Sequence, residues 1–212
     1  YGPFADDVAD AERSLWFWHY NAGKHGVTVD LETVDGQGML RRLAESADMF
    51  IEAEPEGRLP ALGFEPATFR AANPRLITVS ISPFGRGMPR AEELSTDLTI
   101  LASGGPAWSC GYDDHTLPPG RGGGNQGYQT ACHFAVMSAL AALVHRDAGG
   151  PGQHIDVNAH AASNVTTEAG SYQWLVAQQT VQRQTGRHAA ASATLPTQVR
   201  CADGTYANTG IV

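Results

Sequence analysis

A glycine-rich loop that leads into one long apolar segment constrains the fold of this chain most strongly. The loop begins at Gly120, and the segment after it is rich in alanine, leucine and valine, as in Leu140–Val144. Such a segment predicts a helix of about five turns that is apolar on nearly all sides and therefore buried. Glycines and a proline within residues 149–152 should end the helix, and Gln153–Val157 then predicts a short strand.

The glycine loop has two possible roles. Backbone N–H groups at the start of a helix can contact a ligand, and glycines let that ligand approach closely. The same glycines can instead serve only to turn the chain against a sheet. The stretch by itself leaves both roles open.

The first part of the chain alternates between strand and helix patterns. The expected strands are Val27–Leu31, Met49–Glu52 and Leu76–Ser82. The expected helices are Asp35–Ser46 and two short ones, Gly57–Leu62 and Pro66–Ala72. This order predicts an α/β domain with a parallel sheet and right-handed crossovers. Ligands of such sheets bind beyond the carboxyl ends of the strands.

The second part of the chain holds two long connections. Residues 83–96 predict a loop, Asp97–Ser103 a short helix, and residues 104–126 a second loop whose length is typical of a functional or disordered segment. Residues 159–187 are polar and predict a helix with solvated later turns that bridges to another domain or subunit. Asp203-Gly204 between two strand-like runs predicts a hairpin.

Composition excludes several kinds of protein. The net charge is −8 and the 14 basic residues are dispersed, so nucleic acid is not an expected partner. Cys110, Cys132 and Cys201 lie far apart, which predicts neither a disulfide framework nor a metal site and favours a reducing, cytoplasmic setting. No apolar run has the length of a membrane span, so no membrane contact is expected. The sequence lacks a GxGxxG motif after a strand and a P-loop, which argues against a nicotinamide-dependent enzyme.

Four separated segments agree in order and spacing with one known family. They are NAGKHGVTVDL from Asn21, NPRLITVSISPFGRGMP from Asn73, AALVHRDAGGPGQHIDV from Ala141 and RCADGTY from Arg200. Together they resemble the class III coenzyme A transferases, also called the CaiB–BaiF family. The resemblance implies a large domain with a Rossmann-like parallel sheet over residues 1–158, without the first strand–helix–strand unit that full-length members have. It also implies a linker helix over residues 159–195 and the start of a small α+β domain over residues 196–212.

The resemblance also implies an activity and an assembly. Members transfer coenzyme A between carboxylic acids, with acyl-CoA as a substrate rather than a tightly bound cofactor, and one branch racemises the α-carbon of an acyl-CoA. Their dimers contain two interlocked chains. A homodimer, or a pair with a second family copy, is therefore expected here.

The position that matches the catalytic residue of the family is unusual. Family transferases use an aspartate just before the buried helix to attack the thioester, and that position falls on Tyr128 in this chain. No Asp or Glu lies between Asp114 and Asp147. A phenol with a pKa near 10 is a poor substitute for a carboxylate. Three hypotheses remain: an active transferase with altered residues, a non-catalytic half of a fused or paired transferase, or a racemase in which the loop residue His115 is one member of an acid–base pair.

The resemblance assigns CoA contacts to eight positions, namely Val29, Asp30, Ala53, Glu54, Leu62, Ser95, Thr96 and Asp97. Where the family has Glu-Asn-Phe-Arg-Pro-Gly, this chain has residues 52–57 as Glu-Ala-Glu-Pro-Glu-Gly. The two additional carboxylates would repel the phosphates of CoA. The cations best placed to meet phosphate, unless they are only solvated surface charges, are Lys24, Arg58, Arg86 and Arg90.

Overall fold

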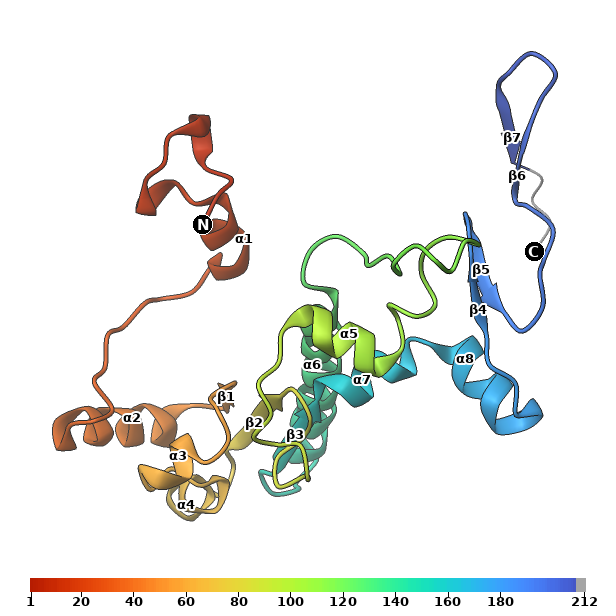
Figure 1. Ribbon diagram of the computed structural model, residues 1–212. Coiled ribbons are helices and arrows are strands. Elements are labelled where there is room, and N and C mark those ends of the chain that lie inside the picture. Colours follow the sequence, from red (N-terminus) through yellow and green to blue (C-terminus); the bar gives the residue numbers. More distant parts are fainter. Residues whose placement is uncertain (209–212) are drawn as a thin grey trace. The chain divides into compact units, whose positions relative to one another are not determined.

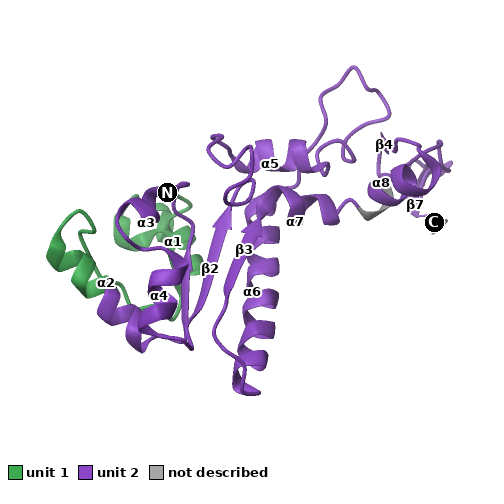
Figure 2. Ribbon diagram, turned by 90° about the horizontal axis from the view of Figure 1, so that it is seen from below, with its two compact units in different colours: residues 1–40 green, residues 41–212 purple. Residues whose placement is uncertain are grey.

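The computed structural model describes residues 1–208. By their internal contacts these residues form two compact units, which meet in the sequence between Leu40 and Arg41 (Figure 2). The first unit contains the 3-10 turns η1 (Ala5–Asp7) and η2 (Ala11–Arg13), the helix α1 (Leu15–Asn21) and the first turns of α2 (Val34–Ser46). The helix predicted over Asp35–Ser46 is therefore confirmed as α2.

The predicted strand at residues 27–31 is wrong. The chain there has no regular structure, although its residues have the composition of a strand. A strand is stable only when a neighbour accepts and donates its backbone hydrogen bonds. No strand among residues 1–208 pairs with this segment, which explains why the local preference does not produce one.

A three-stranded parallel sheet forms the centre of the second unit (Figure 1). Its strands are β1 (Met49–Glu52), β2 (Ile77–Ser82) and β3 (His154–Asn158), in the order β1-β2-β3. The short helices α3 (Arg58–Ala61) and α4 (Pro66–Ala72) lie between β1 and β2 in the sequence. The strands predicted at residues 49–52, 76–82 and 153–157 are therefore confirmed, within a residue or two at their ends.

The core lies between this sheet and the helix α6 (Gln126–Asp147). Ile77 and Val79 lie on one face of the central strand and are fully buried, and Thr78 and Ser80 on the other face are buried as well, as expected for a strand covered on both faces. Figure 2 shows α6 running along the sheet. Its buried apolar side chains are small and recur three or four residues apart, so one helix face packs closely on the strands. They are those of Ala131, Ala135, Ala139 and Ala142.

The other face of α6 is exposed, so the prediction of a helix buried on nearly all sides is wrong. Val136, Met137, Leu140 and Val144 are each more than half exposed. Apolar residues occur on every side of this helix, but in the described part of the chain only one side of α6 packs on a sheet. Among the described residues, α6 is also the one helix long and apolar enough to cross a membrane, by length and composition alone.

Two shorter helices hold the start of α6 in place. These are α5 (Asp97–Gly104) and α7 (Ala159–Val165). They cross so closely that a Cβ atom at Gly104 would lie 2.8 Å from Cβ of Ser163. A glycine at this crossing therefore allows α5 to pack against α7.

The predicted helix over residues 159–187 is divided into several elements. After α7 come α8 (Glu168–Tyr172), the π-helix η3 (Gln173–Ala177) and the antiparallel strands β4 (Gln182–Gln184) and β5 (Arg187–Ala190). The predicted solvation of the later turns holds for Gln178 and Gln179, which are exposed, and is wrong for Arg183 and Gln184, which are buried. The predicted hairpin is confirmed as β6 (Gln198–Arg200) and β7 (Tyr206–Asn208). The boundaries of the large domain, linker and small domain stay a prediction.

Candidate functional site

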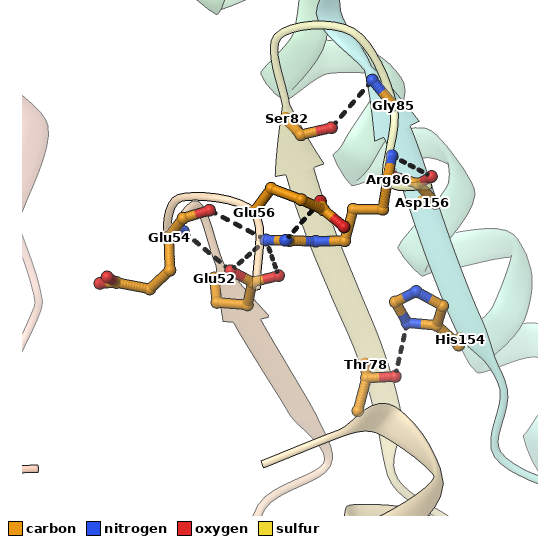
Figure 3. A network of polar contacts seen from close by, with 9 residues as sticks. All are labelled: Glu52, Glu54, Glu56, Thr78, Ser82, Gly85, Arg86, His154 and Asp156. Atoms are coloured by element: carbon orange, nitrogen blue, oxygen red, sulfur yellow. Dashed lines mark hydrogen bonds and ion pairs between the residues drawn. The ribbon is translucent and has the colours of Figure 1, made fainter. Parts of the chain in front are cut away.

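One arginine joins the loops that follow the first two strands of the sheet (Figure 3). Nη2 of Arg86 lies 2.7 and 2.8 Å from the two carboxylate oxygens of Glu52, and Nη1 lies 3.2 Å from Oε2 of Glu56. Nη2 also donates to the Glu54 carbonyl oxygen at 3.0 Å. The exposed fractions are 17% for Arg86, 9% for Glu52 and 26% for Glu56, so the cluster is largely shielded from water.

Backbone contacts extend this cluster to the third strand. The Arg86 N–H donates to Asp156 at 2.9 Å, and the Gly85 N–H donates to Ser82 Oγ at 3.0 Å. The Asn158 amide donates to the Phe84 carbonyl at 2.7 Å. In parallel α/β sheets this edge is where ligands bind. Here side chains of the protein itself fill part of that edge.

A hollow of about 510 Å³ lies beside the cluster, a volume within the range of small-molecule sites. It brings the loops after β1 and β2 together with the first turn of α6 and the start of α7. Tyr128, which is 40% exposed, lines this hollow. The other lining residues include Ala53, Glu54, Glu56, Ser82, Glu92, Glu93, Leu94 and Ser95.

The lining of the hollow is acidic. Four glutamates contribute to it, and among the described lining residues there is no lysine or arginine. Arg58 pairs with Glu54 at 3.0 Å, and Arg90 pairs with Glu93 at 2.8 Å. The hydrogen bond from Arg90 lowers the pKa of the Glu93 carboxyl below its ordinary value, so this carboxylate stays ionised. Three of the four glutamates are thus paired with an arginine, so these arginines are already engaged by carboxylates of the chain itself.

Asp97 is the first residue of α5, lies beside the N-terminus of α6 and is almost fully buried. Its Oδ1 accepts from the backbone N–H of Gly127 at 2.8 Å and of Tyr128 at 3.2 Å. Its Oδ2 pairs with Arg121 at 3.3 Å. A carboxylate is favourable there because the first N–H groups of a helix lack partners within the helix and carry partial positive charge. Asp97 therefore holds the first turn of α6 against α5.

The structure brings some of the predicted CoA-binding residues together. Ala53, Glu54 and Ser95 line the hollow with Tyr128. Thr96 is the N-cap of α5, and its hydroxyl accepts from the Thr99 N–H at 3.3 Å.

The remaining predicted residues have other surroundings. Leu62 is the C-cap of α3 and is not among the residues that line the hollow. Val29 and Asp30 belong to the first unit, where the Asp30 carboxylate accepts from the Glu32 N–H at 3.0 Å. Whether any of these residues binds CoA stays a prediction.

His115 lies in a different part of the second unit. Its Nε2 is 3.3 Å from the Arg183 carbonyl oxygen and its ring lies against that of Trp108, 6.4 Å between centroids. It is not among the residues that line the Tyr128 hollow. Within residues 1–208 no group of three or more His, Cys, Asp or Glu side chains is arranged to hold a metal ion.

The pairing of Arg86 with Glu52 and Glu56 was missed by sequence reasoning, which placed Arg86 among possible phosphate contacts. The acidic run at residues 52–56 was a usable signal, because carboxylates this close together need a cation when they are shielded from water. Which basic residue pairs with these carboxylates depends on how the loop after β2 folds back, and that is a tertiary feature.

His154 should make stability depend on pH. Its Nδ1 lies 2.9 Å from Thr78 Oγ1 on the neighbouring strand, and burial lowers its pKa below the ordinary 6.5. Because the fold favours the neutral ring, its contribution is complete above pH 6.5 and is lost as the pH falls below that value. We expect urea unfolding at about pH 7.5 and about pH 5.5 to show a smaller pH effect in His154→Gln than in the wild type. The exposed His133→Gln variant should keep the wild-type slope, and an unchanged slope in His154→Gln would contradict this assignment.

Comparison with known proteins places the chain in a family. The model of CoA-transferase family III matches residues 1–211. The chain is 33% identical over its whole length to the succinyl-CoA:(R)-benzylsuccinate CoA-transferase subunit BbsE of Thauera aromatica, and covers 50% of that protein. It is 34% identical over 68% of its length to the succinyl-CoA–D-citramalate CoA-transferase of Chloroflexus aurantiacus, and covers 36% of it.

Solved structures agree with this result. A CaiB/BaiF family protein from Brucella suis superposes on 83% of the chain with a TM-score of 0.77 and 30% identity, and the match covers 46% of that protein. The mixed α/β fold with its three parallel strands is therefore that of the family. The chain spans half or less of the length of each of these relatives. It belongs to CoA-transferase family III.

Proposed function

We propose that this chain is the non-catalytic half of a paired family III CoA-transferase, in which a companion family copy supplies the nucleophilic carboxylate. The observation that carries the proposal is the first turn of α6. Tyr128 lines the hollow there, and the one carboxylate that contacts this turn among the described residues, Asp97, is buried and fully engaged.

The chemistry of the transfer explains why this observation matters. A carboxylate oxygen attacks the thioester carbonyl, a mixed anhydride forms, and CoA leaves as a thiolate. Tyr128 offers a hydroxyl in place of a carboxylate, and a hydroxyl attacks a thioester only when a neighbouring base takes its proton. The Asp97 carboxylate accepts two backbone N–H hydrogen bonds and forms an ion pair with Arg121. Because its oxygens are engaged in this way, they are less available to attack a thioester.

Two further features support the proposal. The Arg86 cluster fills part of the edge of the sheet, and the arginines beside the neighbouring hollow are paired with its glutamates rather than available to a phosphate. One relative that matches the whole chain is named as a subunit of its transferase. The assembled protein would act on an acyl-CoA and a carboxylic acid in the cytoplasm, with no tightly bound cofactor.

The test is to produce the chain alone, a second family III chain that carries an aspartate before the equivalent helix alone, and the two together. Thioester exchange between succinyl-CoA and a panel of carboxylic acids is then measured on each sample. The proposal expects the two chains to co-purify and exchange to require the aspartate of the companion. Exchange by this chain alone would contradict it.

Replacing Tyr128 by phenylalanine separates the proposal from an active transferase with an altered nucleophile. Tyr128→Phe removes only the hydroxyl from a side chain that is 40% exposed. We expect exchange by the assembled pair to stay within about twofold of wild type. If the phenol took part in the chemistry, the rate would fall about a hundredfold or more.

A further inference from the structure

A second hollow, of about 460 Å³, lies in the other half of the second unit. It shares no lining residue with the hollow at Tyr128. Its walls come from the loop after α5, the end of α7, α8, the π-helix η3 and the segment that leads into β4. The most prominent apolar groups in it are Trp108, Trp174 and Leu175.

The indole of Trp108 is held in one orientation. Its Nε1 donates to the Val181 carbonyl at 2.8 Å, and the guanidinium carbon of Arg183 lies 5.7 Å from the ring centroid. Arg183 is itself buried and donates to the Leu117 carbonyl at 2.9 Å. A ring fixed in this way loses little conformational entropy when a ligand binds, yet 45% of its surface stays exposed.

An irregular helix forms another part of the lining. Trp174 and Leu175 lie in η3 and are 55% and 72% exposed. Gln178, which ends η3, has a left-handed backbone with φ of 54°. Single-turn π-helices and strained non-glycine residues are both concentrated at binding sites.

The polar groups around this hollow are neutral. They are hydroxyls and amides, among them Ser109, Thr167 and Gln179, and no described lining residue is charged. A charged ligand would lose its hydration without a counter-ion. Aromatic walls with a neutral hydroxyl and amide rim favour an uncharged ring that can also form a hydrogen bond.

We propose that this hollow binds the neutral aromatic group of a small molecule, with its ring against Trp108 and Trp174. The site does not depend on the proposed function, because the residues that form it take no part in the transfer chemistry. It adds to the chain a ligand site that is separate from the acidic hollow.

The experiment titrates the full chain with indole and follows binding by calorimetry. Cyclohexanol and benzoate serve as an aliphatic and a charged comparison. We expect saturable binding of one indole per chain, and binding about tenfold weaker in Trp174→Ala and in Leu175→Ser. Trp18→Ala is the matched control, because Trp18 is a similarly exposed tryptophan (49%) in α1 of the first unit.

Three results would overturn the proposal. The first is that the wild type shows no saturable binding of indole. The second is that Trp174→Ala and Leu175→Ser bind indole as tightly as the wild type does. If these variants keep indole binding but no longer bind the companion chain, the surface is a protein-docking site instead. The third is that benzoate or cyclohexanol binds as tightly as indole.

Discussion

Arg86→Met is expected to lower the free energy of unfolding by about 3–5 kcal/mol. The guanidinium is 17% exposed and is bound by both Glu52 and Glu56, so its removal leaves two carboxylates close together without a cation. The backbone contacts of the loop after β2 would lose their anchor as well. Breaking a shielded ion pair on one side costs far more than the pair contributes, because the remaining charge cannot be hydrated.

Urea or thermal unfolding of purified variants measures this effect. The double variant Glu52→Leu/Arg86→Met should recover part of the loss, because it removes the more deeply buried carboxylate together with the cation. Arg75→Ala is the matched control, since Arg75 pairs with Asp147 at 3.6 Å with both side chains about 60% exposed. That variant should change stability by at most about 1 kcal/mol. If Arg86→Met lowered the free energy of unfolding by no more than Arg75→Ala does, the Arg86 cluster would not be shielded from water.

Asp97→Ala is expected to cost about 2–3 kcal/mol and to loosen the first turn of α6. The substitution leaves the N–H groups of Gly127 and Tyr128 without an acceptor in a largely buried place and removes the partner of Arg121. Asp97→Asn keeps an acceptor oxygen but loses the charge, so its loss should be clearly smaller.

Hydrogen exchange locates this effect in the chain. The amides of Gly127 and Tyr128 should exchange faster in Asp97→Ala, while amides in the second half of α6 should change only as global stability does. Unchanged protection at these two amides would mean that Asp97 does not hold the helix start.

Much of the fold could be predicted because it depends on local patterns. The alternation of short apolar runs with helical spacing predicted β1, β2, β3 and the helices between them, since strand and helix periods differ. The hairpin at Asp203-Gly204 followed from the left-handed turn that glycine permits, and Gly204 has φ of 85°. The segment 27–31 failed because strand preference cannot supply a pairing partner.

The candidate site was only partly predictable. The family resemblance pointed to Tyr128, and the structure places Tyr128 beside Ala53, Glu54 and Ser95 in one hollow. Composition also indicated the acidic character of residues 52–56. The sequence did not indicate that Arg86 would pair with two of these glutamates.

The sequence by itself determined the order and type of the elements from α2 to β3, the family, and the absence of a carboxylate at the start of α6, because each is a property of neighbouring residues or of a motif. The tertiary structure alone decided which face of α6 is buried, that Asp97 caps this helix from α5, and that Trp108 and Trp174 share a hollow. These features join groups 30 or more residues apart, as Asp97 and Gly127 do. Such contacts depend on how helices and loops pack in space, and local patterns carry no record of that packing.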